Sequence, residues 1–272
     1  MTLKKQLQQK LNELSGDTIL IHSDILQGFE IPYNKDREAL LISHVQEIRS
    51  LNANLNIWMP TFNYDFCKGN NYSIKDSPSQ VGVLSEYFRK NISDWRTQIP
   101  VFSFAGTGEK PILDMSGIID PFGSHSAFQV LYERDSLLMH YGSSIKATTI
   151  LHYAERMSNH LCYRYDKLFY GKVIPISGKE IDVTFNFHVR PLGKHLDYDW
   201  NKIENDLLEN NILFLYKEGS CRILLCKIKD LIDFWIERII QNPLYLLDNE
   251  SKTWVEPFLD KLGRPFLITD FE

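Results

Sequence analysis

The segment Thr18-Ile-Leu-Ile-His22 limits the possible folds more than any other feature of this chain. It is an apolar run too short for a buried helix, and it is typical of a strand buried on both faces. Asp36–Leu51 follows with apolar residues at helical spacing, and Leu55–Met59 is a second short apolar run that ends before Pro60. This alternation predicts a layered α/β core. It continues with an expected helix at Gln80–Arg89 and an expected strand at Pro100–Ala105.

The second half of the chain has a different pattern. Ile181–Val189 alternates apolar and polar residues at every position, which is typical of a strand with one solvated face. Leu213–Tyr216 and Arg222–Cys226 are predicted to form a hairpin, and Ile228–Ile239 an amphipathic helix. We therefore predict a single domain over residues 1–272, with an α/β core in residues 1–160 and an antiparallel β and helical portion in residues 161–272.

Composition and charge exclude several classes of function. The 272 residues are 43% hydrophobic and 24% charged, and the net charge is −5. Because nucleic-acid binding needs a basic face, we expect no nucleic-acid partner. The N-terminal segment lacks the apolar core of a secretory signal, and charged residues interrupt the most apolar helix, Leu231–Ile240. We expect no membrane insertion and a cytoplasmic protein.

The cysteines give no sign of a metal site. None of the pairs among Cys67, Cys162, Cys221 and Cys226 has C-x-x-C spacing. Cys221 and Cys226 are predicted to lie on opposite faces of one strand, because their separation is odd. We therefore predict neither a structural zinc site nor any other metal, and free thiols are typical of the cytoplasm.

The segment Thr148-Thr-Ile-Leu-His152-Tyr-Ala-Glu155 carries the strongest candidate for chemistry. Thr148 or Thr149 is a credible N-cap, which places His152 in the first turn of a helix. His152 and Glu155 are three residues apart and share a helix face. The pair fits a general base held by a carboxylate. It also fits a hydrogen-bonded core histidine, and the segment alone does not decide between these interpretations.

Other polar segments follow predicted strands or turns. His22-Ser23 and Pro60-Thr-Phe-Asn-Tyr-Asp65 stand at the carboxyl ends of strands, where α/β proteins bind ligands. Asp120-Pro-Phe-Gly-Ser124 is expected to be a turn before a helix, and Ser103-Phe-Ala-Gly-Thr-Gly108 has the glycine spacing of an acyl-CoA loop without its usual Gln or Arg. Solvated turns explain these segments equally well, and Glu86 by itself fits a surface charge.

Several blocks, taken in order, resemble the aminoglycoside N3-acetyltransferase-like family. The matching blocks lie between residues 18 and 157. They are Ile21-His-Ser23, Met59-Pro-Thr-Phe62, Gly82-Val-Leu-Ser-Glu-Tyr-Phe-Arg89, Asp120-Pro-Phe-Gly-x-x-Ser126 and Thr149-x-Leu-His152-x-x-Glu155. Tyr163-Arg-Tyr-Asp-Lys167 and His188-Val-Arg190 are similar to a branch found with surface-polysaccharide genes.

The resemblance implies a fold, an activity and a set of site residues. The fold is an antibiotic N-acetyltransferase-like α/β/α core, and the activity is acyl transfer from acetyl-CoA or a larger acyl-CoA to a sugar amine. His152 would be the catalytic base, with Glu155 as its partner. The acyl-CoA would meet His22, Ser23, Thr61, Ser103, Gly123 and Thr149, and the acceptor would meet Phe62, Tyr64, Asp65, Glu86 and Arg164.

Two acceptors and one non-enzymatic function follow from these features. The first acceptor is a nucleotide-linked amino sugar of surface-polysaccharide synthesis, for example a dTDP-sugar, which Arg164, Lys167 and Arg190 favour as phosphate ligands. The alternative is an aminoglycoside antibiotic, a polycation that the net charge of −5 favours. A non-catalytic binding module is the third hypothesis, and His152 with Glu155 argues against it. The sequence leaves a homo-oligomer open.

Overall fold

The main sheet combines parallel and antiparallel strands. The computed structural model describes residues 1–32 and 34–272, and in this part of the chain it has a seven-stranded sheet in the order β10-β11-β7-β1-β2-β5-β4. β1 pairs in parallel with β2 and β7, and the outer pairs are antiparallel. The strands are β1 (Thr18–Ser23), β2 (Asn56–Pro60), β4 (Trp95–Arg96), β5 (Phe104–Gly106), β7 (Leu137–Tyr141), β10 (Phe214–Glu218) and β11 (Cys221–Lys227).

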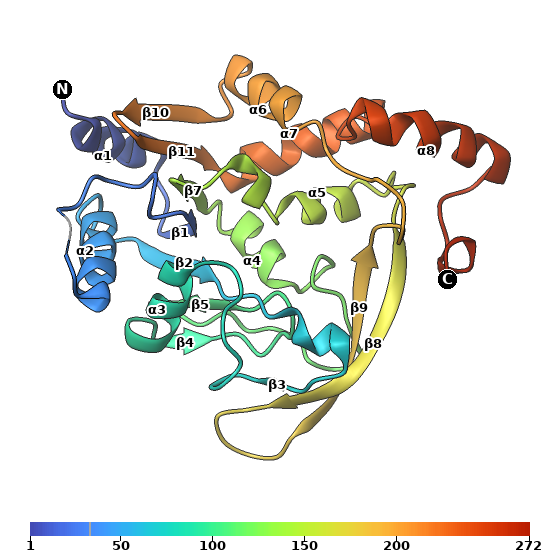
Figure 1. Ribbon diagram of the computed structural model, residues 1–272, viewed down its shortest axis with the longest axis horizontal. Helices are drawn as coiled ribbons and strands as arrows, with labels where there is room; N and C mark the ends of the chain where they lie inside the picture. Colours follow the sequence, from blue (N-terminus) through green and yellow to red (C-terminus); the bar gives the residue numbers. More distant parts are fainter. Residues whose placement is uncertain (33) are drawn as a thin grey trace.

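A second sheet lies beside the main one. Its order within the described residues is β3-β8-β9-β6, and the antiparallel pair β8–β9 forms most of it. Figure 1 shows this pair as a long curved hairpin that runs from near α5 to β3. The strands are β3 (Tyr72–Ser73), β6 (Ile118–Ile119), β8 (Tyr165–Ile174) and β9 (Ile181–Val189).

Helices cover both faces of the main sheet. Apolar residues of α1 (Leu3–Leu14), α2 (Arg37–Arg49) and α3 (Val83–Asn91) share one buried cluster with one face of the sheet. The opposite face packs with α4 (Ala127–Glu133), α5 (Leu151–Met157), α6 (Trp200–Glu209), α7 (Ile228–Gln241) and α8 (Asn249–Leu262). Short 3-10 helices are η1 (Tyr64–Lys68), η2 (Ile145–Ala147) and η3 (Ile268–Asp270). The predicted α/β/α layering is confirmed.

Several elements agree with the sequence patterns. Asp36 caps α2, because its side chain accepts hydrogen bonds from the backbone N–H groups of Glu38 and Ala39. The predicted hairpin is β10–β11, and the predicted amphipathic helix is α7. Cys221 and Cys226 belong to the two opposite buried clusters of β11, as their odd separation predicts.

Two predicted elements are partly wrong. The expected strand Pro100–Ala105 is reduced to β5, because Val101 has a φ of 65° and interrupts the extended backbone before Phe104. The expected helix at Gln80 begins at Val83, since Gly82 has a φ of 111° and the N–H of Gln80 is bonded to Phe62 O. Both departures arise from contacts between segments.

The chain has no stretch suited to a membrane crossing in residues 1–32 and 34–272. None of the helices in this part is both long and apolar enough to cross a bilayer.

Candidate active site

His152 and Glu155 lie side by side on α5. The imidazole Nδ1 of His152 is 2.7 Å from Glu155 Oε2, and the predicted shared face is confirmed. The Glu155 side chain is fully buried, whereas that of His152 is 23% exposed. The imidazole therefore connects a buried carboxylate to the surface of the site.

The predicted threonine cap of α5 is wrong. The N-cap is Ile150, which provides no side-chain hydrogen bond. The Thr148 hydroxyl is instead 2.9 Å from His140 Nε2 and donates to Ile145 O, and the Thr149 hydroxyl donates to Ala147 O. Contacts with β7 and η2 therefore outcompete the local capping geometry.

Three side chains hold the Glu155 carboxylate in place. The hydroxyls of Tyr163 and Tyr198 donate to Oε1 at 2.7 and 2.6 Å. Arg164 Nε lies 3.4 Å from Oε2. Burial acts to raise the pKa of Glu155, but the Arg164 charge and the hydrogen bonds from His152 and Tyr198 lower it to about 2. The carboxylate is therefore ionised at neutral pH.

The environment of His152 favours the neutral imidazole. Burial lowers its pKa most, the Arg164 guanidinium lowers it further, and the hydrogen bond with Glu155 opposes both. An ionised carboxylate can only accept hydrogen bonds, so Nδ1 carries the proton and donates to Glu155. The lone pair of Nε2 then points away from the carboxylate. This is the state that a general base requires.

Aromatic side chains connect His152 with the segment after β2. The Phe122 ring centroid is 5.3 Å from that of His152 and 4.8 Å from that of Phe102. Phe102 in turn contacts Phe62 at 5.2 Å and Tyr64 at 6.1 Å. The structure therefore brings two predicted acceptor residues, Phe62 and Tyr64, to the aromatic wall that contains the neighbours of His152. Phe62 is buried, and the Tyr64 side chain is exposed.

The predicted turn at Asp120–Ser124 precedes α4 and surrounds a small cavity. A cavity of about 290 Å³ is lined by this turn together with Phe102 and Phe128, and Gly123 is among its lining residues. A Cβ atom at Gly123 would lie 3.0 Å from Asp120 Cγ, so the turn needs glycine for close packing. His152 is not among the lining residues; it adjoins this cavity through Phe122.

A larger cavity has one of the predicted acyl-CoA residues, Ser23, in its lining. It measures about 590 Å³ and is lined by the end of β1, the N-terminus of α3 and Ala147. Ser23 lines it, and its hydroxyl has no partner among the described residues. His22, at the same end of β1, is buried, and its ring stacks on that of His140 with the centroids 5.2 Å apart. Burial lowers the pKa of His22 to about 4. Thr149, two residues after Ala147, is partly buried.

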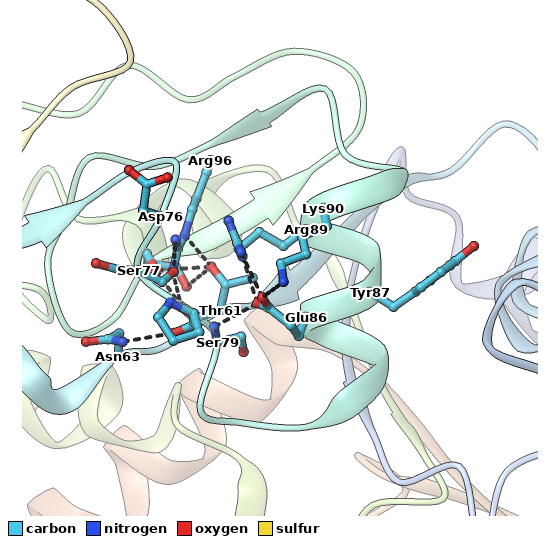
Figure 2. A network of polar contacts seen from close by, with 12 residues as sticks. Thr61, Asn63, Asp76, Ser77, Ser79, Glu86, Tyr87, Arg89, Lys90 and Arg96 are labelled. Atoms are coloured by element: carbon cyan, nitrogen blue, oxygen red, sulfur yellow. Dashed lines mark hydrogen bonds and ion pairs between the residues drawn. The ribbon is translucent and has the colours of Figure 1, made fainter. Parts of the chain in front are cut away.

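Thr61 and Ser103 form part of a different, enclosed network. Their hydroxyls are 3.0 Å apart, and both residues are fully buried. Arg96 donates to the Thr61 hydroxyl and carbonyl and to the carbonyls of Ile74 and Ser77, as Figure 2 shows for most of these contacts. With no exposed surface, Thr61 and Ser103 support the end of β2 from inside. Their predicted contact with CoA stays a prediction.

Glu86 and Asp65 are each paired with cations rather than facing His152. Figure 2 shows the Glu86 carboxylate beside Arg89 and Lys90. It also accepts a hydrogen bond from the Ser79 N–H. Asp65 pairs with Lys68 at 3.0 Å. Their predicted contacts with the acceptor stay predictions, and the described ion pairs already neutralise both charges.

Arg164 has a different place from the one expected of an acceptor ligand. Its guanidinium is 8% exposed and is engaged by Glu155, the Tyr198 hydroxyl and His188 O. It therefore acts on Glu155 from the protein interior. Tyr163 and Tyr198 were missed by the sequence analysis. Tyr163 begins a segment singled out there, but nothing local indicates that Tyr198, 43 residues from Glu155, reaches the same carboxylate.

No group of three or more His, Cys, Asp or Glu side chains suited to a metal ion occurs in the part of the chain that the structure describes.

Comparisons with known proteins identify the family and the fold. The model of the aminoglycoside 3-N-acetyltransferase family matches residues 41–239. Among solved structures, a mutant of aminoglycoside acetyltransferase AAC(3)-IVa in complex with a gentamicin has a TM-score of 0.69 at 20% identity, covering 92% of this chain and 93% of that chain. AAC-IIIb with CoASH has a TM-score of 0.67 at 16% identity, covering 88% and 96%.

The YokD protein from Bacillus subtilis is also similar, with a TM-score of 0.63 at 17% identity and coverage of 88% and 94%. A search of the curated proteins finds no match. At these identities the solved structures show the fold, whereas the family model spans most of the chain. The chain therefore belongs to the aminoglycoside 3-N-acetyltransferase family and is an acyltransferase.

Proposed function

We propose that this protein transfers an acyl group from acyl-CoA to the amine of a nucleotide-linked amino sugar in the cytoplasm, by direct transfer with His152 as general base. The observation that carries the proposal is the neutral His152 imidazole, whose Nδ1 is bonded to the buried, ionised Glu155. Its Nε2 is thereby left as an acceptor at the surface of the site.

The chemistry requires one proton to move twice. His152 Nε2 takes a proton from the acceptor amine as the amine attacks the thioester carbonyl. The tetrahedral intermediate collapses with loss of the CoA thiolate, and the imidazolium returns the proton to that sulfur. Glu155 stabilises the imidazolium between these steps, because the carboxylate remains ionised 2.7 Å away.

The cysteines support direct transfer rather than an acyl-enzyme. Burial raises the pKa of Cys67 to about 11 and that of Cys162 to about 11. A thiolate is the nucleophilic form of cysteine, so both side chains are unreactive thiols at neutral pH. Cys221 is also buried, and its pKa is raised to about 11.

The cavity at Ser23 is the proposed site of the acyl-CoA. It lies at the carboxyl end of β1 and reaches the N-terminus of α3, where Gly82 provides no side-chain cap. Unbonded N–H groups at a helix start favour a phosphate group of the cofactor. The donor is acetyl-CoA or a larger acyl-CoA, and the shape of this cavity with its ligand would decide between them.

The pairing of charges favours a monoamine over a polycationic drug. Arg156 binds both Asp120 and Asp166, Arg164 neutralises Glu155, and cations accompany Asp65 and Glu86. A polycation needs carboxylates that are not already paired. Of the three cations that favour a nucleotide sugar, Arg164 is engaged by Glu155 and Lys167 by Glu272. Arg190 remains, in a loop with Lys194 beside a cavity of about 370 Å³.

An aminoglycoside is the second candidate acceptor. It is favoured by the family itself and by the structural similarity to an AAC(3)-IVa mutant in complex with a gentamicin. The two candidates differ in charge and in the presence of a diphosphate, so one assay separates them.

The test follows the release of CoA thiol from acetyl-CoA and from longer acyl-CoAs. Parallel reactions receive a dTDP-amino sugar or gentamicin, with wild type, His152→Ala and the control His160→Ala. His160 is a suitable control because its ring is bonded to Ser158 O, after the end of α5. We expect turnover with the dTDP-amino sugar, a loss of about 100- to 10,000-fold in His152→Ala, and little change in His160→Ala. Turnover with gentamicin alone would move the proposal to resistance, and no turnover with any donor would refute it.

A further inference from the structure

The β8–β9 hairpin has one polar face, and this face lies beside α5, the helix that carries His152. Asp166 on β8 is paired in register with His188 on β9. Arg156, four residues after His152 on α5, reaches across to Asp166 at 3.1 Å and also binds Asp120 at 2.7 Å. Residues four apart lie on one helix face, so His152 lies on the side of α5 from which Arg156 reaches the hairpin.

Two polar atoms on this face are buried without a hydrogen-bond partner among the described residues. They are Asn186 Oδ1 and His188 Nε2. Asn186 is 9% exposed, and the His188 side chain is 10% exposed. Native proteins rarely leave such atoms unpaired, and each instance calls for a physical explanation. Because the two residues are separated by one position, their side chains point to the same face of β9.

Asp166 orients the two side chains that carry these atoms. Its carboxylate oxygen is 2.8 Å from His188 Nδ1. The hydrogen bond from His188 is the largest influence that lowers the pKa of Asp166, and Arg156 and Asn186 lower it further. An ionised carboxylate accepts only, so His188 donates from Nδ1, and in the neutral imidazole Nε2 keeps a lone pair. The Asn186 amide, oriented by the same carboxylate, presents its oxygen.

Further contacts place this pair next to the catalytic centre. The carbonyl of His188 accepts a hydrogen bond from Arg164, the residue that also contacts Glu155. Phe187, between the two polar residues, points to the opposite face of β9 and packs on Phe102 with ring centroids 5.1 Å apart. Phe102 contacts Phe122, which contacts His152, so these rings place the strand, rather than its polar face, beside the catalytic centre.

We propose that Asn186 and His188 form the subsite that binds hydroxyl groups of the acceptor sugar. Both atoms are acceptors, so they are complementary to sugar hydroxyls, which donate. One residue lies between them, so their Cα atoms are about 6.6 Å apart along the strand, which suits hydroxyls on two positions of one sugar ring. The subsite would hold the ring so that its amine faces His152 Nε2. This inference rests on the proposed function, because it assigns the acceptor of that reaction.

The experiment combines variants of the protein with variants of the acceptor. Asn186→Leu and His188→Phe keep the approximate shape of each side chain and remove the acceptor atom. Thr184→Val, two residues before Asn186 on the same face of β9, is the matched control. Each protein is assayed with the dTDP-amino sugar and with analogues that lack one ring hydroxyl, and with gentamicin if that acceptor is the one turned over. The KM for acyl-CoA and the circular dichroism spectrum report on folding and on the donor site.

We expect Asn186→Leu and His188→Phe to lower kcat/KM for the acceptor by about 10- to 100-fold, with the KM for acyl-CoA unchanged. Removing the sugar hydroxyl that contacts the mutated residue should lower kcat/KM of the wild type by about the same factor. It should lower kcat/KM of the variant by less than about threefold, because the variant has already lost the contact. Thr184→Val should behave as wild type. If His188→Phe fails to fold, His188→Leu, which also lacks an acceptor atom, provides the same comparison.

The outcomes separate this inference from the proposed function. If the removal of each hydroxyl lowers kcat/KM equally in wild type and in both variants, the subsite is overturned and the acyltransferase proposal stays intact. Absence of turnover by wild type with all acceptors would remove both. An equal loss of kcat/KM with every analogue, accompanied by a higher KM for acyl-CoA, would assign Asn186 and His188 a structural role and also overturn the subsite.

Discussion

Two networks of polar and charged side chains, one around Glu155 and one around Arg96, differ in one respect. Around Glu155, the hydrogen-bond donors Tyr163, Tyr198 and His152 meet one carboxylate, and the imidazole keeps Nε2 free. Around Arg96, the guanidinium is buried and binds carbonyl and hydroxyl oxygens of neighbouring segments. Both networks are buried, but only the first presents a reactive lone pair at the surface of the site.

Burial and a perturbed pKa are therefore insufficient to identify a catalytic centre. Glu86, beside the Arg96 network, has a pKa lowered to about 2 just as Glu155 has. Its partners Arg89 and Lys90 are permanent cations, so no neutral base results. Glu155 is paired with a histidine, which can take and return a proton near neutral pH. The identity of the partner, rather than the size of the shift, therefore separates the two sites.

The largest effect is expected in the Arg96 network. Arg96→Met removes the donors to the carbonyls of Thr61, Ile74 and Ser77, and we expect a loss of about 3 kcal/mol in the free energy of unfolding. Urea denaturation measures this loss, and kcat of the folded protein should remain within about threefold of wild type. A stable variant with a selective loss of turnover would contradict the structural role assigned to Arg96.

Glu155→Gln should affect the reaction more than the fold. The amide preserves the shape and still accepts from His152, but it removes the charge that stabilises the imidazolium. We expect kcat to fall by about 10- to 100-fold, equivalent to roughly 1.4 to 2.8 kcal/mol. Steady-state kinetics at saturating donor and acceptor measures it. Glu47→Gln, at a half-exposed ion pair with Lys4, is the control. Unchanged turnover in Glu155→Gln would show that the carboxylate serves the fold alone.

The pH dependence of kcat tests how Glu155 acts on His152. His152 loses activity when protonated, and its pKa is lowered, so activity should be retained as the pH falls to 6.5 and be lost below it. Glu155 favours the protonated imidazole, and its replacement by glutamine should therefore move the acid limb to still lower pH. Measurements of kcat against pH for both proteins test this sign. An acid limb that moves to higher pH in Glu155→Gln would contradict the arrangement.

The smallest effect is expected at Glu86. Burial opposes ionisation of Glu86, but hydrogen bonds from Arg89 and Ser79 N–H outweigh it and lower the pKa to about 2. A depressed carboxyl pKa contributes stability above pH 4.5 that is lost as the pH falls toward 2. Glu86→Gln should cost about 1 kcal/mol at pH 7, since the pair is partly exposed, and progressively less as the pH falls toward 2. If the charge of Glu86 did not contribute to stability, thermal unfolding at several pH values would show the same cost of Glu86→Gln at each pH.

Much of the fold follows from local patterns. The continuous apolar residues of β1 and β2, the capping Asp36 of α2 and the alternation of β9 each act over a few neighbouring positions. The strand expected at Pro100–Ala105 failed because Val101 adopts a positive φ, which no local pattern indicates. The threonine cap of α5 failed because His140, on another strand, takes the Thr148 hydroxyl.

The proposed catalytic pair follows from local spacing, since His152 and Glu155 are three residues apart on one helix and their contact depends only on helix geometry. What that pair can do depends on tertiary contacts. The ionised state of Glu155 requires Arg164 and the hydroxyl of Tyr198, which comes from a distant segment. The same is true of Asn186 and His188, whose position opposite α5 depends on the path of the β8–β9 hairpin. Local spacing fixes neighbours along one element, whereas burial and charge depend on segments that meet only when the chain is folded.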